Sequence, residues 1–370
     1  MKRVLFLIPD LSHGGAEKVL VNLANNLDKS KYEVSIKTLF DKGVNRQYIG
    51  DDVRYIPGLR WQFRGNSHLI RRVPAKLLYR CFVKEKYDII VSYLEGSTAR
   101  VLSGCTDPST KRVAWIHIEL GSEKKIASGF KNSRLAVEAY KKFDKVVFVS
   151  RTVKEAFEKT ADDALNNGVV LYNTVESSLI LKKSQECIDD LILSDDVNIC
   201  SVAKIINTKG YDRLVRVHKR LLDEGLKHHI YILGVGEQQE ELERYLHKYG
   251  LEDSFTFVGF RDNPYKYVAA CDLYVCSSRR EGFSTAVTES LIVGTPVVST
   301  CCSGAHELLG ENNEYGIVTE NSEDGIYSGL KRMLEDPELL EYYRNKAIER
   351  GKEFSTAKTV CEVEKMLESI

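Results

Sequence analysis

Two glutamates, Glu281 and Glu289, stand eight positions apart around a predicted helix start, so that both carboxylates could serve one polar ligand. Gly282 follows the first of them, and a residue without a side chain lets the backbone approach a ligand closely. Backbone N–H groups at a helix start favour a phosphate. The groups expected to face it are those of Phe283, Ser284 and Thr285. Because carboxylates accept hydrogen bonds from sugar and ribose hydroxyls, the segment indicates a nucleotide-sugar site, with two solvated helix charges as the alternative.

Two lysines, Lys204 and Lys209, lie five positions apart in the loop that follows a predicted strand of the second half. Gly210 comes next, where a helix is expected to begin. Two cations at such a place can hold a diphosphate and neutralise the charge that develops as it leaves. The loop therefore favours a diphosphate clamp over the alternative of a solvated turn.

Three further features follow predicted strands. The paired glycines Gly14 and Gly15 open a helix after the first strand, and such a helix start can face a diphosphate. They lack the G-x-G-x-x-G spacing, which argues against a dinucleotide enzyme. His117 ends another strand, where a lone histidine is more often structural than catalytic. Arg261 follows a strand that ends at Val258, and its loop is a further candidate for ligand binding.

A pattern of strand, loop and helix repeats along both halves of the chain and positions these residues. Apolar runs predict strands at 4–8, 32–40, 89–93, 113–116, 146–149 and 169–172, then at 198–203, 229–233, 255–258, 273–276 and from 297. After Gly316 only helices are expected. Such alternation predicts α/β domains with right-handed parallel crossovers. Because ligands of these folds bind beyond the carboxyl ends of the strands, we expect the site in a cleft between the halves.

The segment from Ser277 to Thr300, together with these loops, resembles the retaining glycosyltransferases of family 4, also called glycosyl transferases group 1. That family has the α/β GT-B fold, in which two Rossmann-like domains face each other. The resemblance is strongest over 199–317 and weakest over 41–109. It implies that Glu281 contacts the transferred sugar and that Glu289 contacts the donor ribose.

The same resemblance assigns roles to the other loops. Gly14 and Gly15 match glycines that lie against the donor phosphates, and His117 matches a histidine beside the transferred sugar. Lys204 stands where the family usually has arginine, so a point charge replaces bidentate phosphate binding. Lys209 matches the lysine that holds the diphosphate. The loop of Arg261 lies where the family builds its base pocket, so we assign it to nucleobase recognition. The expected catalytic residues are His117, Lys209 and Glu281.

Length and polarity set the expected domain boundaries. At 370 residues the chain exceeds what one core usually serves, and its 43% hydrophobic content can fill two cores. A polar, irregular stretch predicts the linker between them. The expected parts are an acceptor-side domain at 1–173, a linker at 174–196, a nucleotide-sugar domain at 197–352, and a C-terminal helix at 353–370 that could pack back on the first domain.

Nine cysteines are scattered without a CxxC pair or a His/Cys cluster at ligand spacing, which argues against structural zinc and fits a reducing compartment. The apolar run from Val4 to Ile8 is too short for a signal peptide or a membrane span. No DxD motif follows a strand, and the two lysines could act in place of a divalent metal. We therefore expect a cytoplasmic protein that uses no metal or other cofactor.

Charge is divided unevenly between the halves. There are 30 Lys and Arg against 19 Asp and Glu up to Val175, and 23 against 34 after it. Much of the excess lies at 60–86, where Lys76, Arg80 and Lys84 repeat every four positions on an expected amphipathic helix. An anionic membrane surface is one partner for such a helix, which would make the protein peripheral on the inner face of the cell membrane; an ordinary solvated face is the alternative. The acidic second half argues against nucleic acid.

The sequence as a whole favours a retaining transferase that moves a hexose or N-acetylhexosamine from a nucleoside diphosphate sugar to an acceptor hydroxyl. A UDP-sugar is favoured over a GDP-sugar as the donor. The acceptor is expected to be a glycan or a lipid-linked glycan of surface polysaccharide assembly, contacted by Glu95 and Ser97. The alternatives are a non-catalytic GT-B partner subunit and a nucleotide-sugar epimerase or phosphorylase on the same fold.

Overall fold

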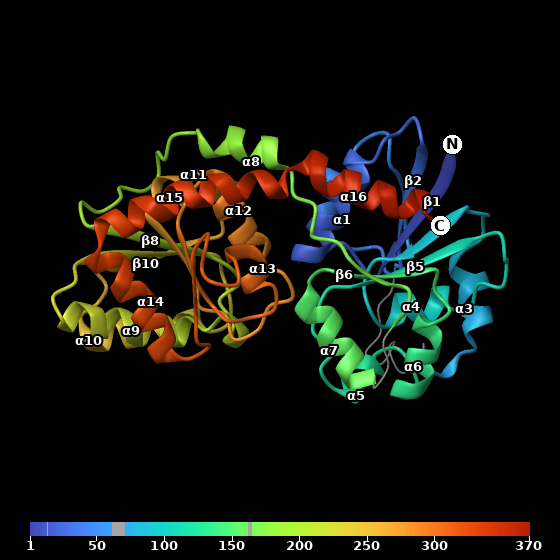
Figure 1. The fold of residues 1–370 in the computed structure, drawn as a ribbon, viewed down its shortest axis with the longest axis horizontal. Coiled ribbons are helices and arrows are strands. Elements are labelled where there is room, and N and C mark those ends of the chain that lie inside the picture. Colours follow the sequence, from blue (N-terminus) through green and yellow to red (C-terminus); the bar gives the residue numbers. More distant parts are fainter. Residues whose placement is uncertain (13, 61–70, 162–164) are drawn as a thin grey trace. The chain divides into compact units, whose positions relative to one another are not determined.

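The computed structural model describes residues 1–12, 14–60, 71–161 and 165–370. The chain divides into two compact units, and each contains its own parallel sheet covered by helices (Figure 1). Unit 1 comprises Met1–Val175 and Thr356–Ile370, and unit 2 comprises Glu176–Ser355. The expected organisation into two parallel α/β domains is therefore confirmed.

In the described part of unit 1, seven strands lie in the order β3-β2-β1-β4-β5-β6-β7, and all of them pair in parallel. The strands are β1 (Lys2–Ile8), β2 (Tyr32–Thr38), β3 (Arg54–Ile56), β4 (Ile89–Ser92), β5 (Lys111–Ile116), β6 (Lys145–Phe148) and β7 (Gly168–Val170). The helices are α1 (Gly15–Asn26), η1 (Val44–Tyr48), α3 (Ala75–Phe82), α4 (Ser97–Leu102), α5 (Glu123–Ile126), α6 (Ser133–Tyr140), α7 (Arg151–Ala161) and α16 (Thr356–Glu368). The strand order reverses between β1 and β4, where folds of this kind bind ligands at the carboxyl edge.

Unit 2 repeats this design with six parallel strands in the order β10-β9-β8-β11-β12-β13. The strands are β8 (Val197–Val202), β9 (His228–Leu233), β10 (Phe255–Gly259), β11 (Leu273–Cys276), β12 (Val297–Thr300) and β13 (Ile317–Thr319). The helices are α8 (Ser177–Ser184), η2 (Asn207–Lys209), α9 (Tyr211–Asp223), α10 (Gln239–Tyr249), α11 (Tyr265–Ala270), α12 (Thr285–Val293), α13 (Ala305–Leu309), α14 (Glu323–Glu335), α15 (Pro337–Gly351) and η3 (Lys352–Phe354). Strands β11 and β12 are buried along their whole length, which explains why they read as continuous apolar runs.

Two short edge strands depart from the sequence-based expectation. The expectation that only helices follow Gly316 is wrong, because β13 pairs with β12 from Ile317 onward. In unit 1, β3 was not predicted, and it pairs with β2 through Arg54, Tyr55 and Ile56. Each strand is three residues long, so neither is long enough to show a periodic pattern.

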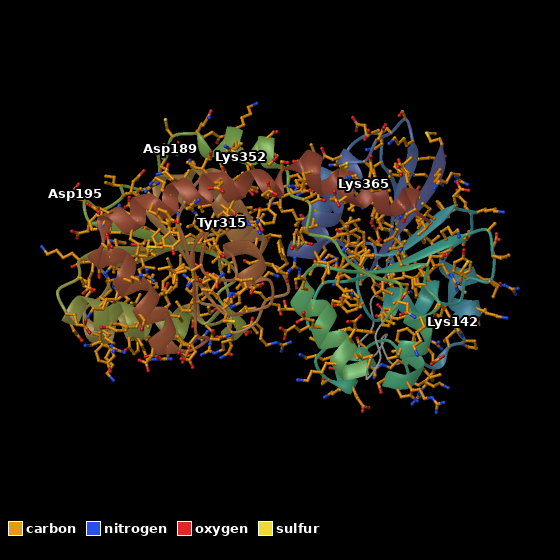
Figure 2. The ribbon with its side chains drawn as sticks, viewed as in Figure 1. Lys142, Asp189, Asp195, Tyr315, Lys352 and Lys365 are labelled. Carbon is orange, nitrogen blue, oxygen red and sulfur yellow. The ribbon has the colours of Figure 1, made fainter. Side chains whose placement is uncertain are left out.

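The segment expected to be a linker, 174–196, contains a helix. Helix α8 packs against α11 and α12 of unit 2. Beyond it, Lys266 Nζ donates to Asp189 Oδ1 at 3.1 Å, and Figure 2 shows Asp189 on the segment that follows α8. Much of this segment is therefore part of the second α/β unit.

The C-terminal helix α16 belongs to unit 1, although it follows the last helix of unit 2 in the chain. Figure 2 shows Lys365 on this helix. The backbone N–H of Asp28 donates to Glu364 Oε1 at 2.8 Å, and Lys31 Nζ lies 2.9 Å from Glu368 Oε1. These bonds attach α16 beside the start of β2.

The basic segment forms helix α3, which ends at Phe82, so Lys84 lies beyond the helix instead of on its face. Lys76 and Arg80 are exposed, and Leu77 keeps 53% of its surface accessible. Residues 61–70 of the segment lie outside the described residues. The described helix therefore presents cations and an apolar side chain to solvent.

Three residues of unit 2 form a hydrogen-bonded chain that joins α9, β9 and the turn before β10; His218 and His228 are buried, and Ser254 is half-buried. His228 Nδ1 donates to the Leu226 carbonyl at 2.8 Å, so its Nε2 is left to accept from His218 Nδ1, also at 2.8 Å. His218 Nε2 then accepts from the Ser254 hydroxyl at 2.9 Å. Burial, followed by the neighbouring histidines, lowers the pKa of His218 to about 2. The native chain therefore requires a neutral His218.

This arrangement predicts a loss of stability on acidification. The unfolded state binds a proton at His218 below its ordinary pKa of 6.5 and the folded state does not, so the free energy of unfolding falls as the pH drops below 6.5. One such group contributes up to about 1.4 kcal/mol per pH unit. Urea unfolding between pH 7 and pH 5 should show a steeper loss for the wild type than for His218→Gln. Replacement of the exposed His247 by Gln is the control; equal slopes for wild type and His218→Gln would contradict the prediction.

Candidate functional site

The expected catalytic residues Lys209 and Glu281 meet at the carboxyl edge of the unit 2 sheet. Lys209 ends the 3-10 helix after β8, and Glu281 lies in the loop after the adjacent strand β11. Their Nζ and Oε1 atoms are 2.6 Å apart, and the side chains are only 25% and 15% exposed. The hydroxyl of Ser278 donates to the same oxygen, also at 2.6 Å. Residues 72 positions apart in sequence thus form one charged pair.

The backbone around Lys209 is held by close contacts with the loop after β11. Gly210 has a φ of +71°, and a Cβ there would overlap the carbonyl oxygen of Ser277. The Ser277 hydroxyl donates to the Lys209 carbonyl at 2.8 Å, and the buried Arg213 donates to the Ser277 carbonyl at 2.7 Å. Because Gly210 permits this approach, the loop after β8 packs directly against the loop after β11, and this contact fixes the position of Lys209.

Burial and charge act in opposite directions on Lys209. Burial lowers the pKa of the lysine, but the Glu281 carboxylate more than offsets this effect, and the pKa is raised. The lysine therefore stays charged at neutral pH. A cation held in a partly desolvated place is suited to an anionic ligand, provided that the ligand replaces the carboxylate.

Helix α12 begins where the sequence predicted, and its first residues have different environments. Ser284 is the N-cap, and its hydroxyl accepts from the Val287 N–H at 3.4 Å. Phe283 is buried, with its ring centroid 6.0 Å from that of Phe354. Thr285 is the first helical residue. The side chains of Phe283 and Ser284 thus serve packing and capping, which leaves the backbone as the part of this turn suited to a ligand.

Glu289 lies on α12, and its Oε1 accepts from the hydroxyl of Tyr265 at 3.2 Å. Lys204 follows β8 and is exposed; among the residues that the structure describes, its side chain has no ion-pair partner. Its charge is accordingly available to a ligand.

Sequence reasoning missed the loop after β9. A Cβ on Gly234, which has a φ of +148°, would overlap the Ala203 carbonyl, and a Cβ on Gly236 would overlap the Ile205 carbonyl. The Ile205 N–H donates to the Val235 carbonyl at 3.1 Å. These contacts support the backbone on either side of Lys204. The Gly-Val-Gly spacing after an apolar run was the available signal.

Arg261 is engaged outside the Lys209–Glu281 pair. Its Nε donates to Asp190 Oδ2 at 2.9 Å and to the Tyr267 hydroxyl at 3.2 Å. The Tyr267 hydroxyl also donates to Asp190. The guanidinium therefore binds the segment after α8.

The expected residues of unit 1 gather at the carboxyl edge of its own sheet. His117 follows β5, and its backbone N–H donates to Glu95 Oε2 at 3.0 Å. The imidazole is buried, with its centroid 4.9 Å from the ring of Tyr93 and 6.4 Å from that of Trp115. Burial lowers the pKa of His117 to about 3, against a smaller opposing effect of a hydrogen bond to the Tyr93 backbone. The ring is therefore neutral at physiological pH.

Gly14 is the N-cap of α1, and Gly15 is its first residue. A Cβ on Gly14 would overlap the carboxylate of Glu17, so this carboxylate lies over the glycine at the helix start. Ser97 begins α4, two residues after Glu95. Unit 1 therefore brings glycines, a neutral histidine and two carboxylates to one edge of its sheet.

The described residues contain no group of three or more His, Cys, Asp or Glu side chains that could hold a metal ion. They also include no helix with the length and apolar character needed to cross a membrane. What the site in unit 2 offers is a fixed positive charge, two carboxylates and a helix N-terminus, which suits an anion joined to a polyhydroxylated group.

Two family models match the chain. Residues 188–350 match the model described as glycosyl transferases group 1, and residues 13–179 match the model described as glycosyltransferase family 4. Together they cover most of both units.

Relatives with glycosyltransferase names agree with these matches, and solved structures share the fold. One relative is the N-acetylgalactosamine-N,N'-diacetylbacillosaminyl-diphospho-undecaprenol 4-alpha-N-acetylgalactosaminyltransferase of Campylobacter jejuni. The two sequences are 28% identical over 384 residues, and the alignment covers 99% of this chain and 100% of that protein. The chain is 27% identical over 155 residues to the lipopolysaccharide core biosynthesis glycosyltransferase LpsE of Rhizobium meliloti, with 42% and 43% covered. The fold matches Anabaena HepE in complex with UDP, with a TM-score of 0.79, 20% identity and full coverage of both chains. It also matches sucrose-phosphate synthase of Thermosynechococcus elongatus, with a TM-score of 0.77, 16% identity, and 100% and 99% covered.

Proposed function

The chain belongs to the family 4 glycosyltransferases of the GT-B fold, and we propose that it transfers a hexose or N-acetylhexosamine from a UDP-sugar to an acceptor hydroxyl with retention of the anomeric configuration. The observation that carries the donor assignment is the contact of Lys209 with Glu281 at 2.6 Å. It joins, at one sheet edge, a cation suited to the diphosphate and a carboxylate suited to the sugar. A UDP donor is supported by the fold similarity to HepE, which was solved with UDP.

In this proposal the diphosphate takes Lys209 away from Glu281. Lys209 and the exposed Lys204 then neutralise the charge that grows on the departing phosphate, which is the role a divalent metal fills in other transferases. Glu281 turns to the sugar hydroxyls, and Glu289 to the ribose. The backbone N–H groups at the start of α12 provide further hydrogen bonds for the donor. The reaction would therefore proceed without metal.

Retention needs an explanation, since many retaining glycosidases use a carboxylate nucleophile. We assign no carboxylate to that role. Instead, an oxygen of the leaving phosphate, held by Lys209, takes the proton of the acceptor hydroxyl as this hydroxyl attacks the same face of the sugar. His117 contacts the transferred sugar as a neutral imidazole, consistent with its lowered pKa. Gly14 and Gly15 approach the phosphates through their backbone, for which the Glu17 carboxylate must move aside.

For the acceptor we propose a lipid-linked glycan of surface polysaccharide assembly. Support comes from the Campylobacter relative, whose name specifies a diphospho-undecaprenol acceptor, and from LpsE. Glu95 and Ser97 were expected to contact the acceptor; the Glu95 side chain accepts a hydrogen bond from the His117 N–H, and Ser97 begins α4 two residues further along the chain. The alternatives of a non-catalytic subunit, an epimerase or a phosphorylase are not favoured, because these relatives are glycosyltransferases.

A donor panel tests this function. Purified protein is incubated with UDP- and GDP-linked glucose, galactose and their N-acetyl forms, with a polyprenyl-diphosphate glycan as acceptor and with or without EDTA. We expect transfer from a UDP-sugar that survives the chelator, and NMR of the product should show the donor's anomeric configuration. Inversion, dependence on added metal, or release of sugar without transfer would contradict the respective parts of the proposal.

Replacement of Glu281 tests the role of its carboxylate. Glu281→Gln should lower turnover roughly tenfold or more, because a hydrogen bond to a charged group is worth about 1.5–3 kcal/mol. Steady-state kinetics with saturating UDP-sugar measures this, and Glu240→Gln on the exposed face of α10 is the matched control. Wild-type turnover in a folded Glu281→Gln variant would eliminate the assignment.

We also propose that α3 attracts the protein to anionic membrane, since Lys76, Arg80 and the 53% exposed Leu77 face solvent. Sedimentation with acidic vesicles should fall with rising salt and in Lys76→Glu/Arg80→Glu, because both weaken the attraction. The variant Lys142→Glu/Lys159→Glu has the same change in net charge elsewhere in unit 1. Equal pelleting of the two variants would mean that α3 is an ordinary solvated helix.

A further inference from the structure

We propose that Glu95 is a positioning residue for His117: its carboxyl group holds the main chain of the histidine, and its role is carried out through His117 instead of by contact with the acceptor. This inference rests on the proposed transfer of a sugar. It replaces the direct acceptor contact that the sequence suggested for Glu95.

The contact lies where the ladder between two adjacent strands has ended. Strands β4 and β5 pair in parallel, and the last paired residues are Ser92 and Ala114. Glu95 lies three residues after Ser92, and His117 lies three residues after Ala114. Glu95 Oε2 accepts the hydrogen bond of the His117 N–H at 3.0 Å. A side chain thus takes the place of a backbone carbonyl beyond the ladder and fixes the peptide group that carries His117.

The loop that bears Glu95 is itself fixed by backbone contacts. Gly96 has a φ of +85°, and a Cβ there would lie 2.9 Å from Ser128 Oγ. Gly129 has a φ of +77°, and a Cβ there would overlap the Gly96 backbone. The Gly96 N–H also donates to the buried hydroxyl of Tyr140 at 3.4 Å. Because this loop has little room to adjust, a shorter side chain at position 95 cannot regain the His117 N–H by a backbone shift.

The ring of His117 needs such support because few polar contacts orient it. It packs on Tyr93 and Trp115, and its buried Nε2 has no hydrogen-bond partner among the described residues. With Nδ1 directed to the Tyr93 backbone, Nε2 is left as an acceptor. A buried acceptor without a hydrogen bond is unfavourable unless a ligand hydroxyl donates a hydrogen bond to it. The direction of this lone pair follows from the His117 backbone, and therefore from Glu95.

The surroundings of Glu95 are consistent with a structural acceptor of hydrogen bonds. Burial raises the pKa of Glu95, the N–H groups of His117 and of Glu95 itself oppose the rise, and the Glu17 carboxylate adds to it. The His117 N–H requires a side-chain oxygen from position 95 within hydrogen-bond distance; a full negative charge on that oxygen is not needed. Reach and charge can be separated by substitution.

Two variants make this separation. Glu95→Gln keeps the reach and an accepting oxygen without the charge, whereas Glu95→Asp keeps the charge and loses one methylene of reach. We expect Glu95→Gln to retain turnover within about threefold and Glu95→Asp to lose roughly tenfold or more, with unchanged UDP affinity in both. Glu138→Gln, exposed on α6, is the control. If Glu95→Gln fails and Glu95→Asp works, the charge acts directly on reactants and the proposal is overturned; it is also overturned if both variants match the wild type.

A spectroscopic measurement decides the point without activity. In protein labelled with ¹⁵N-histidine, the His117 amide signal is identified by its loss in His117→Gln. Loss of the carboxyl acceptor should move its proton resonance upfield in Glu95→Asp, and Glu95→Gln should restore most of the shift. If no UDP-sugar is a donor, the proposed function fails while this result still tests the contact. An amide signal that does not move in Glu95→Asp overturns the positioning role.

Discussion

The ion pair between Lys209 and Glu281 is the constraint around which unit 2 is organised at its carboxyl edge. The Nζ atom of Lys209 and the Oε1 atom of Glu281 lie 2.6 Å apart, and the two side chains are only 25% and 15% exposed. Removing one partner of such a pair leaves the other partly desolvated and uncompensated, which is costly. The left-handed Gly210, the Ser277 hydroxyl and the buried Arg213 hold the backbone on which this contact depends. In the proposed function, donor binding is then an exchange of anions at one fixed cation.

At the carboxyl edge of its own sheet, unit 1 has a buried histidine, His117. Burial keeps His117 neutral, so its imidazole offers a hydrogen-bond acceptor instead of a positive charge. The carboxyl group of Glu95 fixes the backbone of that histidine. The carboxyl edge of the unit 2 sheet thus presents a partly buried ion pair, and that of unit 1 presents a neutral histidine held by a carboxyl group.

The sequence predicted the two α/β domains and singled out Lys209 and Glu281 for identifiable reasons, although it did not predict the contact between these two residues. Buried parallel strands such as β11 appear as continuous apolar runs, and Gly282 next to a glutamate marks a strand-to-helix turn. It did not predict the edge strands β3 and β13, which are too short for a pattern, or helix α8 within the expected linker. The contact of Arg261 with Asp190 was also not predictable, because it depends on how the segment after α8 lies beside the loop after β10. Glu95 was predicted to contact the acceptor, but only the aligned strand ends reveal its bond to His117.

Calorimetric binding of UDP across a double-mutant cycle of Lys209 and Glu281 tests the central claim most directly. The proteins are the wild type, Lys209→Met, Glu281→Gln and the double variant. If the diphosphate must take Lys209 from Glu281, then Glu281→Gln binds UDP several-fold more tightly than the wild type, and this gain disappears when residue 209 is methionine. Weaker UDP binding by Glu281→Gln, or the same gain with and without the lysine, would contradict the exchange of partners on which the account depends.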